Sequence, residues 1–151
     1  QLISYIPEYS TDMLICNVQE YLCQKINAWE ILRSLPTEFS RTLAMHMKQR
    51  KYKVKQLSDA SLVNERTIQR LLANEAHNTS LNTIIAICIG LNLSPIFSFD
   101  LISKSGCGFK RTAEHNAYKV ILIAHYHSDI YKCNEILESM NIPLLGNKEF
   151  L

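Results

Sequence analysis

The chain has 151 residues, of which 47% are hydrophobic and 20% are charged, so it can bury the core of one domain with appendages. It contains four glycines and four prolines, and strand-like alternation is scarce, which favours an all-α protein. No apolar run reaches the roughly 18 residues that cross a bilayer, and no secretory signal is visible at the N-terminus.

The net charge of +2 is unevenly distributed. Residues 41–79 carry eight Lys and Arg against three acidic residues, a net charge of +5. Residues 1–40 carry a net charge of −3, from two basic and five acidic residues, and residues 80–151 have six of each. The positive charge is therefore concentrated in one segment, which indicates an acidic partner such as nucleic acid.

Apolar residues recur at helical spacing along most of the chain. The first predicted helix covers residues 11–35 and stops before Pro36, and a second begins with Thr37 as its cap and runs to about residue 51. Ser80 caps an apolar helix over 80–93, and Ser94 with Pro95 starts a short one. The glycine-containing stretch 105–108 is a boundary, after which we expect helices over about 112–127 and 129–140. Pro143 and Gly146 are expected to end the ordered pattern.

Between the second and third of these helices lies the most informative stretch, residues 54–72. It predicts two short helices, about 54–61 and 65–74, joined by a tight turn. Asn64 is expected to cap the second helix by accepting a backbone N–H. The apolar residues Leu57, Val63, Ile68 and Leu71 fall on the inner face of this unit, and polar residues fall on the outer face.

On these residues the sequence resembles the Cro/repressor-type (XRE-like) helix-turn-helix family, over about residues 39–102. The resemblance implies a lambda-repressor-like five-helix bundle whose second motif helix reads the major groove of DNA. Two positions depart from the family pattern. Leu62 stands where the turn usually has Gly, which predicts either a different turn or a strained one, because a left-handed Leu costs about 1 kcal/mol. Val54 stands where a phosphate-binding Gln is usual.

The resemblance and the charge together predict a DNA-binding surface. Lys48, Arg50, Lys51, Lys53 and Lys55 would neutralise phosphates, and the outer face of helix 65–74 would contact bases. An arginine can bind guanine bidentately, and Gln can bind adenine. The predicted DNA-binding residues are Lys53, Lys55, Asn64, Glu65, Arg66, Thr67, Gln69, Arg70 and Asn74.

Other kinds of site are weaker. The residues His115, His125, His127, Cys107 and Cys133 match no standard zinc spacing, so no metal and no cofactor are predicted. No pattern links a particular Cys to a particular His, so no catalytic residue and no enzymatic activity are predicted. The five scattered cysteines include no CxxC pair and fit the reducing cytoplasm.

We therefore expect an all-α, cytoplasmic, DNA-binding transcriptional regulator that binds double-stranded DNA, does not enter the membrane and pairs as a homodimer. Its predicted parts are an N-terminal helical arm (1–36), a helix-turn-helix domain (37–104) and a C-terminal helical extension (105–151). The alternative is a protein-interaction module of a toxin–antitoxin or metallopeptidase-linked system, and a third is a ligand sensor. The chain begins with Gln1 rather than Met, which fits a fragment with an upstream or partner domain.

Overall fold

The computed structural model describes residues 29–75 and 79–146, and all regular secondary structure in these residues is helical. The chain divides into two compact units, Gln1–Leu35 and Pro36–Leu151. The prediction of an all-α fold is confirmed. Of the predicted helix 11–35, residues 29–34 are described and helical, and its remainder lies outside the described residues.

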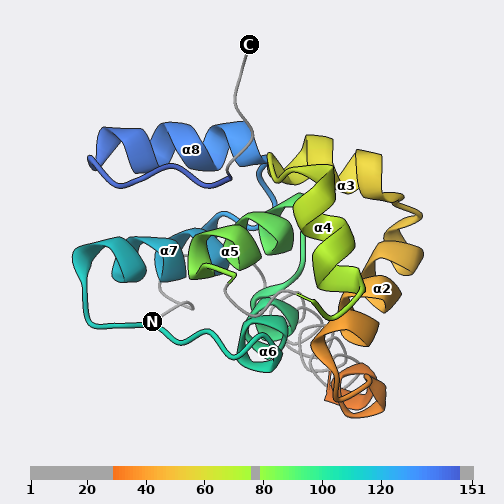
Figure 1. The fold of residues 1–151 in the computed structure, drawn as a ribbon. Coiled ribbons are helices and arrows are strands. Elements are labelled where there is room, and N and C mark those ends of the chain that lie inside the picture. The colour runs from red at the N-terminus through yellow and green to blue at the C-terminus, as the bar shows by residue number, and fades with distance from the viewer. Residues whose placement is uncertain (1–28, 76–78, 147–151) are drawn as a thin grey trace, which may run out of the picture. The chain divides into compact units, whose positions relative to one another are not determined.

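The second unit contains the helices that matter for function (Figure 1). They follow one another as α2 (Phe39–Arg50), α3 (Val54–Ser61), α4 (Glu65–Leu72), α5 (Leu81–Gly90), α6 (Pro95–Lys104), α7 (Ala113–Ala124) and α8 (Ile130–Ser139).

The central helix is α5, which contacts α3, α6, α7 and α8. Every residue of α5 except Asn82 is buried, as expected of a helix that is apolar on all sides. Its last residue, Gly90, lies so close to α3 that a Cβ atom there would be 2.8 Å from Cβ of Ser61. The absence of a side chain at this position therefore permits the close approach of α3 to α5.

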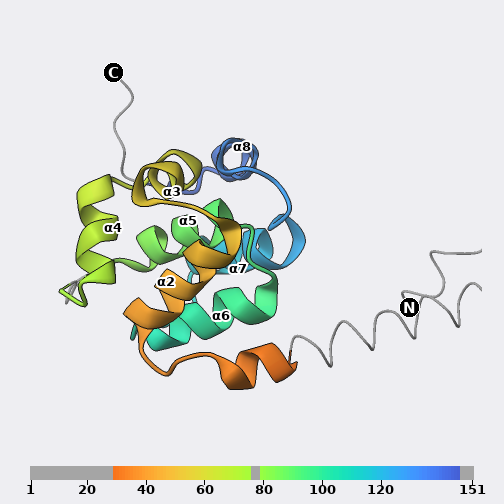
Figure 2. The same ribbon diagram turned by 90° about the vertical axis from the view of Figure 1, so that its right-hand side faces the viewer.

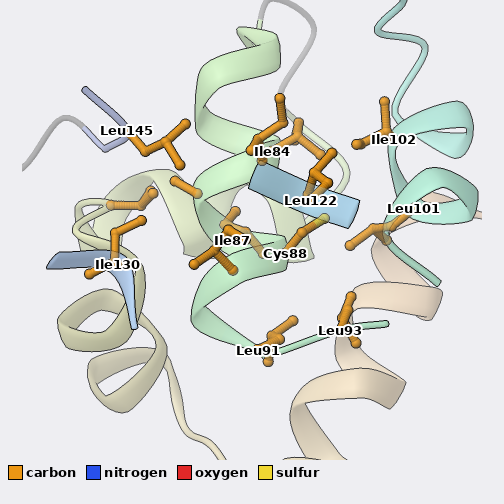
Figure 3. Packing of buried hydrophobic residues seen from close by; sticks show 14 of the residues in the cluster. Ile84, Ile87, Cys88, Leu91, Leu93, Leu101, Ile102, Leu122, Ile130 and Leu145 are labelled. Carbon is orange, nitrogen blue, oxygen red and sulfur yellow. The ribbon is translucent and has the colours of Figure 1, made fainter. Parts of the chain in front are cut away.

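The C-terminal helices α7 and α8 extend this core. Tyr118 and Leu122 of α7 and Ile130 of α8 belong to the same buried cluster as the residues of α5. Figure 3 shows Leu122 and Ile130 together with residues of α5 in this cluster. The predicted division into 1–36, 37–104 and 105–151 remains a proposal. In this division the helix-turn-helix domain ends with α6, and the C-terminal extension begins at residue 105.

Most helix starts agree with the predicted caps. Ser80 accepts a hydrogen bond from the backbone N–H of Thr83, and Ser94 lies at the N-cap of α6 with Pro95 after it. Thr112, which was not predicted as a cap, accepts a hydrogen bond from the N–H of His115 at the start of α7. The predicted cap at Thr37 is wrong, because α2 begins one residue later with Glu38 at the N-cap position. Helix α4 ends at Leu72 rather than at the predicted residue 74.

Candidate nucleic-acid interface

The turn that joins α3 to α4 contains a left-handed residue. Leu62 has φ 58° and ψ 28°, and its backbone N–H donates to the carbonyl of Ser58 over 2.9 Å. The sequence predicted either a different turn or a strained one, and the structure has the strained one. The left-handed backbone of Leu62 costs about 1 kcal/mol of stability. The Leu62 side chain is 4% exposed, and its burial offsets this cost.

Two serines fix the turn from the inside. The Ser58 hydroxyl donates to the carbonyl of Val63 over 2.6 Å, and the Ser61 hydroxyl donates to the carbonyl of Leu57 over 2.6 Å. The N–H of Val63 in turn donates to Ser61 Oγ over 3.3 Å. All three bonds are buried, where hydrogen bonds are costly to break. The two bonds that involve Val63 tie the end of α3 to the turn before α4.

Helix α4 lies at the edge of the second unit, against α2 and α3 (Figure 2). It buries only Ile68 and Leu71, which attach it to the core. Its outward residues are exposed, apart from Thr67, which is half-buried. The helix therefore presents a polar face of the kind that enters a major groove.

The first turns of α4 border a surface hollow of about 480 Å³ between α3 and α4. It brings together five of the predicted DNA-binding residues with Ser58: they are Asn64, Glu65, Arg66, Thr67 and Arg70. Asn64 occupies the N-cap position as predicted, but its side chain makes no capping hydrogen bond. Glu65 lies in the first turn and Arg70 in the last, so both complement the helix dipole.

The other predicted DNA-binding residues lie outside this hollow. Gln69 is exposed on α4. Asn74 lies past the end of the helix with φ 59°, and borders a separate hollow with Phe39 and Lys104. Lys53 and Lys55 are exposed at the start of α3, where the N–H of Lys53 donates to the Gln56 side chain and so fixes the first turn.

One of the predicted phosphate ligands, Arg50, also has a structural role. Arg50 Nε donates to the carbonyl of Leu91 over 2.8 Å, and its guanidinium lies 6.0 Å from the centre of the Tyr52 ring. Arg50 therefore ties the end of α2 to the turn after α5. Arg50 is itself exposed, and the exposed lysines Lys48, Lys51, Lys53 and Lys55 lie near it beside the motif.

The groups with shifted pKa values lie away from α4, in the core. Burial raises the pKa of the Cys88 thiol to about 12 and that of Cys133 to about 11. Both thiols stay protonated at neutral pH, so neither is an activated nucleophile. Within the described ranges, no group of three or more His, Cys, Asp or Glu residues is arranged to hold a metal ion.

The family relationship agrees with this geometry. Residues 42–96 match the model of the Cro/C1-type HTH DNA-binding domain. This chain carries a Cro/C1-type helix-turn-helix domain. The match extends from α2 to the start of α6 and includes the whole motif, as the resemblance over 39–102 predicted. Comparisons with curated proteins and with solved structures found no match.

The matched segment leaves α7 and α8 outside the Cro/C1-type domain, although both pack on α5. None of the described helices is long and apolar enough to cross a membrane.

Proposed function

We propose that this chain is a transcriptional regulator that reads the major groove with α4. The observation that carries the proposal is the one-sided burial of this helix within a Cro/C1-type domain. Ile68 and Leu71 attach α4 to the core, while Arg66, Gln69 and Arg70 are exposed. A helix anchored in this way can enter the groove without unfolding, and its long polar side chains reach base edges.

The two binding tasks fall on different helices. The exposed cations Lys48, Lys51, Lys53 and Lys55, at the end of α2 and the start of α3, would neutralise phosphates and set the register. Each neutralised phosphate adds about 0.9 to the slope of log K against log salt concentration, so removing one lysine should lower the slope by about one.

Base contacts would come from α4 itself. Arg66 and Arg70 would each donate to guanine and Gln69 to adenine, with roughly 1–3 kcal/mol of discrimination per good contact. Thr67 offers a methyl group to thymine, and Glu65 can accept from cytosine. Asn64 and Asn74, at the two ends of α4, would bind the DNA backbone.

We also propose that the chain acts in the cytoplasm as a homodimer, because DNA readers of this type pair to match two half-sites about 34–36 Å apart. Sedimentation equilibrium at high protein concentration measures this. A dimer supports the pairing, and a monomer at all concentrations contradicts it.

The proposal is tested by substituting both arginines of α4. Arg66→Ala with Arg70→Ala should weaken binding to a duplex selected by the wild-type protein about a hundredfold, from two lost contacts. The control is Arg111→Ala with Lys132→Ala, which removes the same charge from exposed positions of the C-terminal extension. Equal losses in both variants, or none in the first, would contradict base reading by α4. A chain that selects no duplex at all would favour a protein-interaction module instead.

A further inference from the structure

The last described residues fold back onto the helix-turn-helix motif. Residues 143–146, here called the C-terminal strap, follow α8 and return to the turn between α3 and α4. Leu145 is 2% exposed and belongs to the same buried cluster as Leu62 and Ile130. Figure 3 shows Leu145 on the side of α5 that also faces Ile130. Leu145 therefore anchors the strap in the core.

Three side chains from three helices hold the strap. Asn82 of α5 donates to the carbonyl of Leu144 over 2.9 Å and accepts from the N–H of Gly146 over 3.1 Å. Asn134 of α8 bonds both backbone groups of Leu145, over 2.7 Å at the N–H and 3.1 Å at the carbonyl.

The third side chain is Tyr118 of α7, whose hydroxyl donates to the carbonyl of Pro143 over 2.9 Å and accepts from Asn82 over 3.0 Å. Asn82 is the one residue of α5 that is not buried, and its amide is engaged at both its oxygen and its nitrogen. These hydrogen bonds position the backbone of the strap residue by residue.

At its end the strap touches the motif's turn directly. A Cβ atom on Gly146 would lie 2.7 Å from both Cβ and the carbonyl oxygen of Leu62, closer than real Cβ atoms come to other atoms. Gly146 also has φ +93°, a conformation that side chains disfavour. Gly146, the only residue of the strap without a side chain, is therefore in close contact with Leu62, the left-handed residue of the turn.

We infer that the C-terminal strap positions helix α4. The contact of Gly146 with Leu62 holds the turn from the outside. The hydrogen bonds of Ser58 and Ser61 hold it from the inside. The direction in which α4 leaves the turn then depends on residues beyond the segment that matches the Cro/C1-type family. The expected effect on DNA binding rests on the proposed function. The contact between Gly146 and Leu62 is independent of that function.

The test compares three glycines in the full chain. Gly146→Ala introduces a methyl group against Leu62. Gly106→Ala is the control for backbone strain, because Gly106 has φ +80° but nothing within 4 Å of an added Cβ. Gly108→Ala is the neutral control, since its added Cβ also meets nothing within 4 Å. Asn82→Ala, which removes two anchors and adds no atoms, is the second variant of the strap.

The first readout is hydrogen exchange without DNA, at a temperature where circular dichroism shows all variants folded. We expect Gly146→Ala and Asn82→Ala to raise exchange at the amides of Leu62 and Val63 about tenfold, with α6 unchanged and with no such effect in the two controls. Unchanged exchange at the turn would overturn the inference. So would a uniform rise over the chain, because it would mean that the strap adds only global stability.

The second readout is affinity for the selected duplex and for a random-sequence duplex. Gly146→Ala should weaken the first about tenfold and leave the second within about twofold, because phosphate contacts survive a misdirected α4 and base contacts do not. Equal losses on both duplexes would overturn the inference. If the wild-type chain binds neither duplex, the proposed function fails, and hydrogen exchange alone decides whether the strap holds the turn.

Discussion

Helices α4 and α5 lie close together in the sequence and are opposite in construction. Helix α5 buries nine of its ten residues and contacts four other helices, whereas α4 buries two of its eight. Helix α5 is the centre of the hydrophobic core, whereas α4 lies on the surface with most of its residues accessible. A protein that reads DNA needs both, because a displayed helix keeps its direction only if its support is rigid.

The largest effect should come from removing apolar volume in α5. Ile87 is fully buried, and Ile87→Ala deletes its outer carbons and leaves a cavity. We expect the free energy of unfolding to fall by about 3 kcal/mol, as measured by urea denaturation. A loss below about 1 kcal/mol would mean that α5 is not the centre of the core. On α4, by contrast, the double substitution of Arg66 and Arg70 by Ala should change stability by less than about 0.5 kcal/mol.

A smaller effect is expected where α5 meets the motif. Gly90→Ala places a methyl group 2.8 Å from Ser61 Cβ, so α3 has to shift. Overpacking of this kind costs about 2 kcal/mol, and the same denaturation measures it. Gly108→Ala, with open space around its added Cβ, is the control. Equal stability of the two variants would show that the α3–α5 contact is looser than the structure has it.

The third prediction concerns pH and a buried group of α2. His46 is 3% exposed, its Nε2 atom makes no hydrogen bond, and its ring lies 5.7 Å from the Phe97 ring. Burial lowers its pKa below the usual 6.5, Asp100 raises it by a smaller amount, and Lys104 lowers it further.

Because the unfolded chain takes up the proton first, the contribution of neutral His46 to stability is complete above the unfolded pKa of about 6.5 and is lost as the pH falls below it. The urea midpoint should therefore fall on acidification, and it should fall less in His46→Leu than in the wild-type chain. If the urea midpoints of the wild-type chain and of His46→Leu fall equally on acidification, the loss of stability at low pH comes from groups other than His46.

The local parts of this fold could be predicted from the sequence, because the signals are local too. Ser80 caps its helix through a bond to the N–H three residues on, and the spacing of Ile68 and Leu71 identifies the inner face of α4. The outward residues of the motif followed from the same periodicity. Their roles on DNA remain predictions.

The parts that sequence reasoning missed are long-range. Arg50 lies in a basic run, which predicts a phosphate contact but gives no sign that its Nε donates to the Leu91 carbonyl, 41 residues away. The C-terminal strap depends on Asn82 and Gly146, 64 residues apart, and no local pattern marks either residue. In the sequence, Gly146 predicts only the end of the ordered pattern.

Amide NMR of the chain titrated with the selected duplex tests most directly whether α4 reads DNA. We expect the amide resonances of residues 64–70 and of Lys53 and Lys55 to shift, while those of α7 and α8 stay in place. Shifts concentrated in α7 and α8, with α4 unchanged, would contradict the reading of DNA by α4.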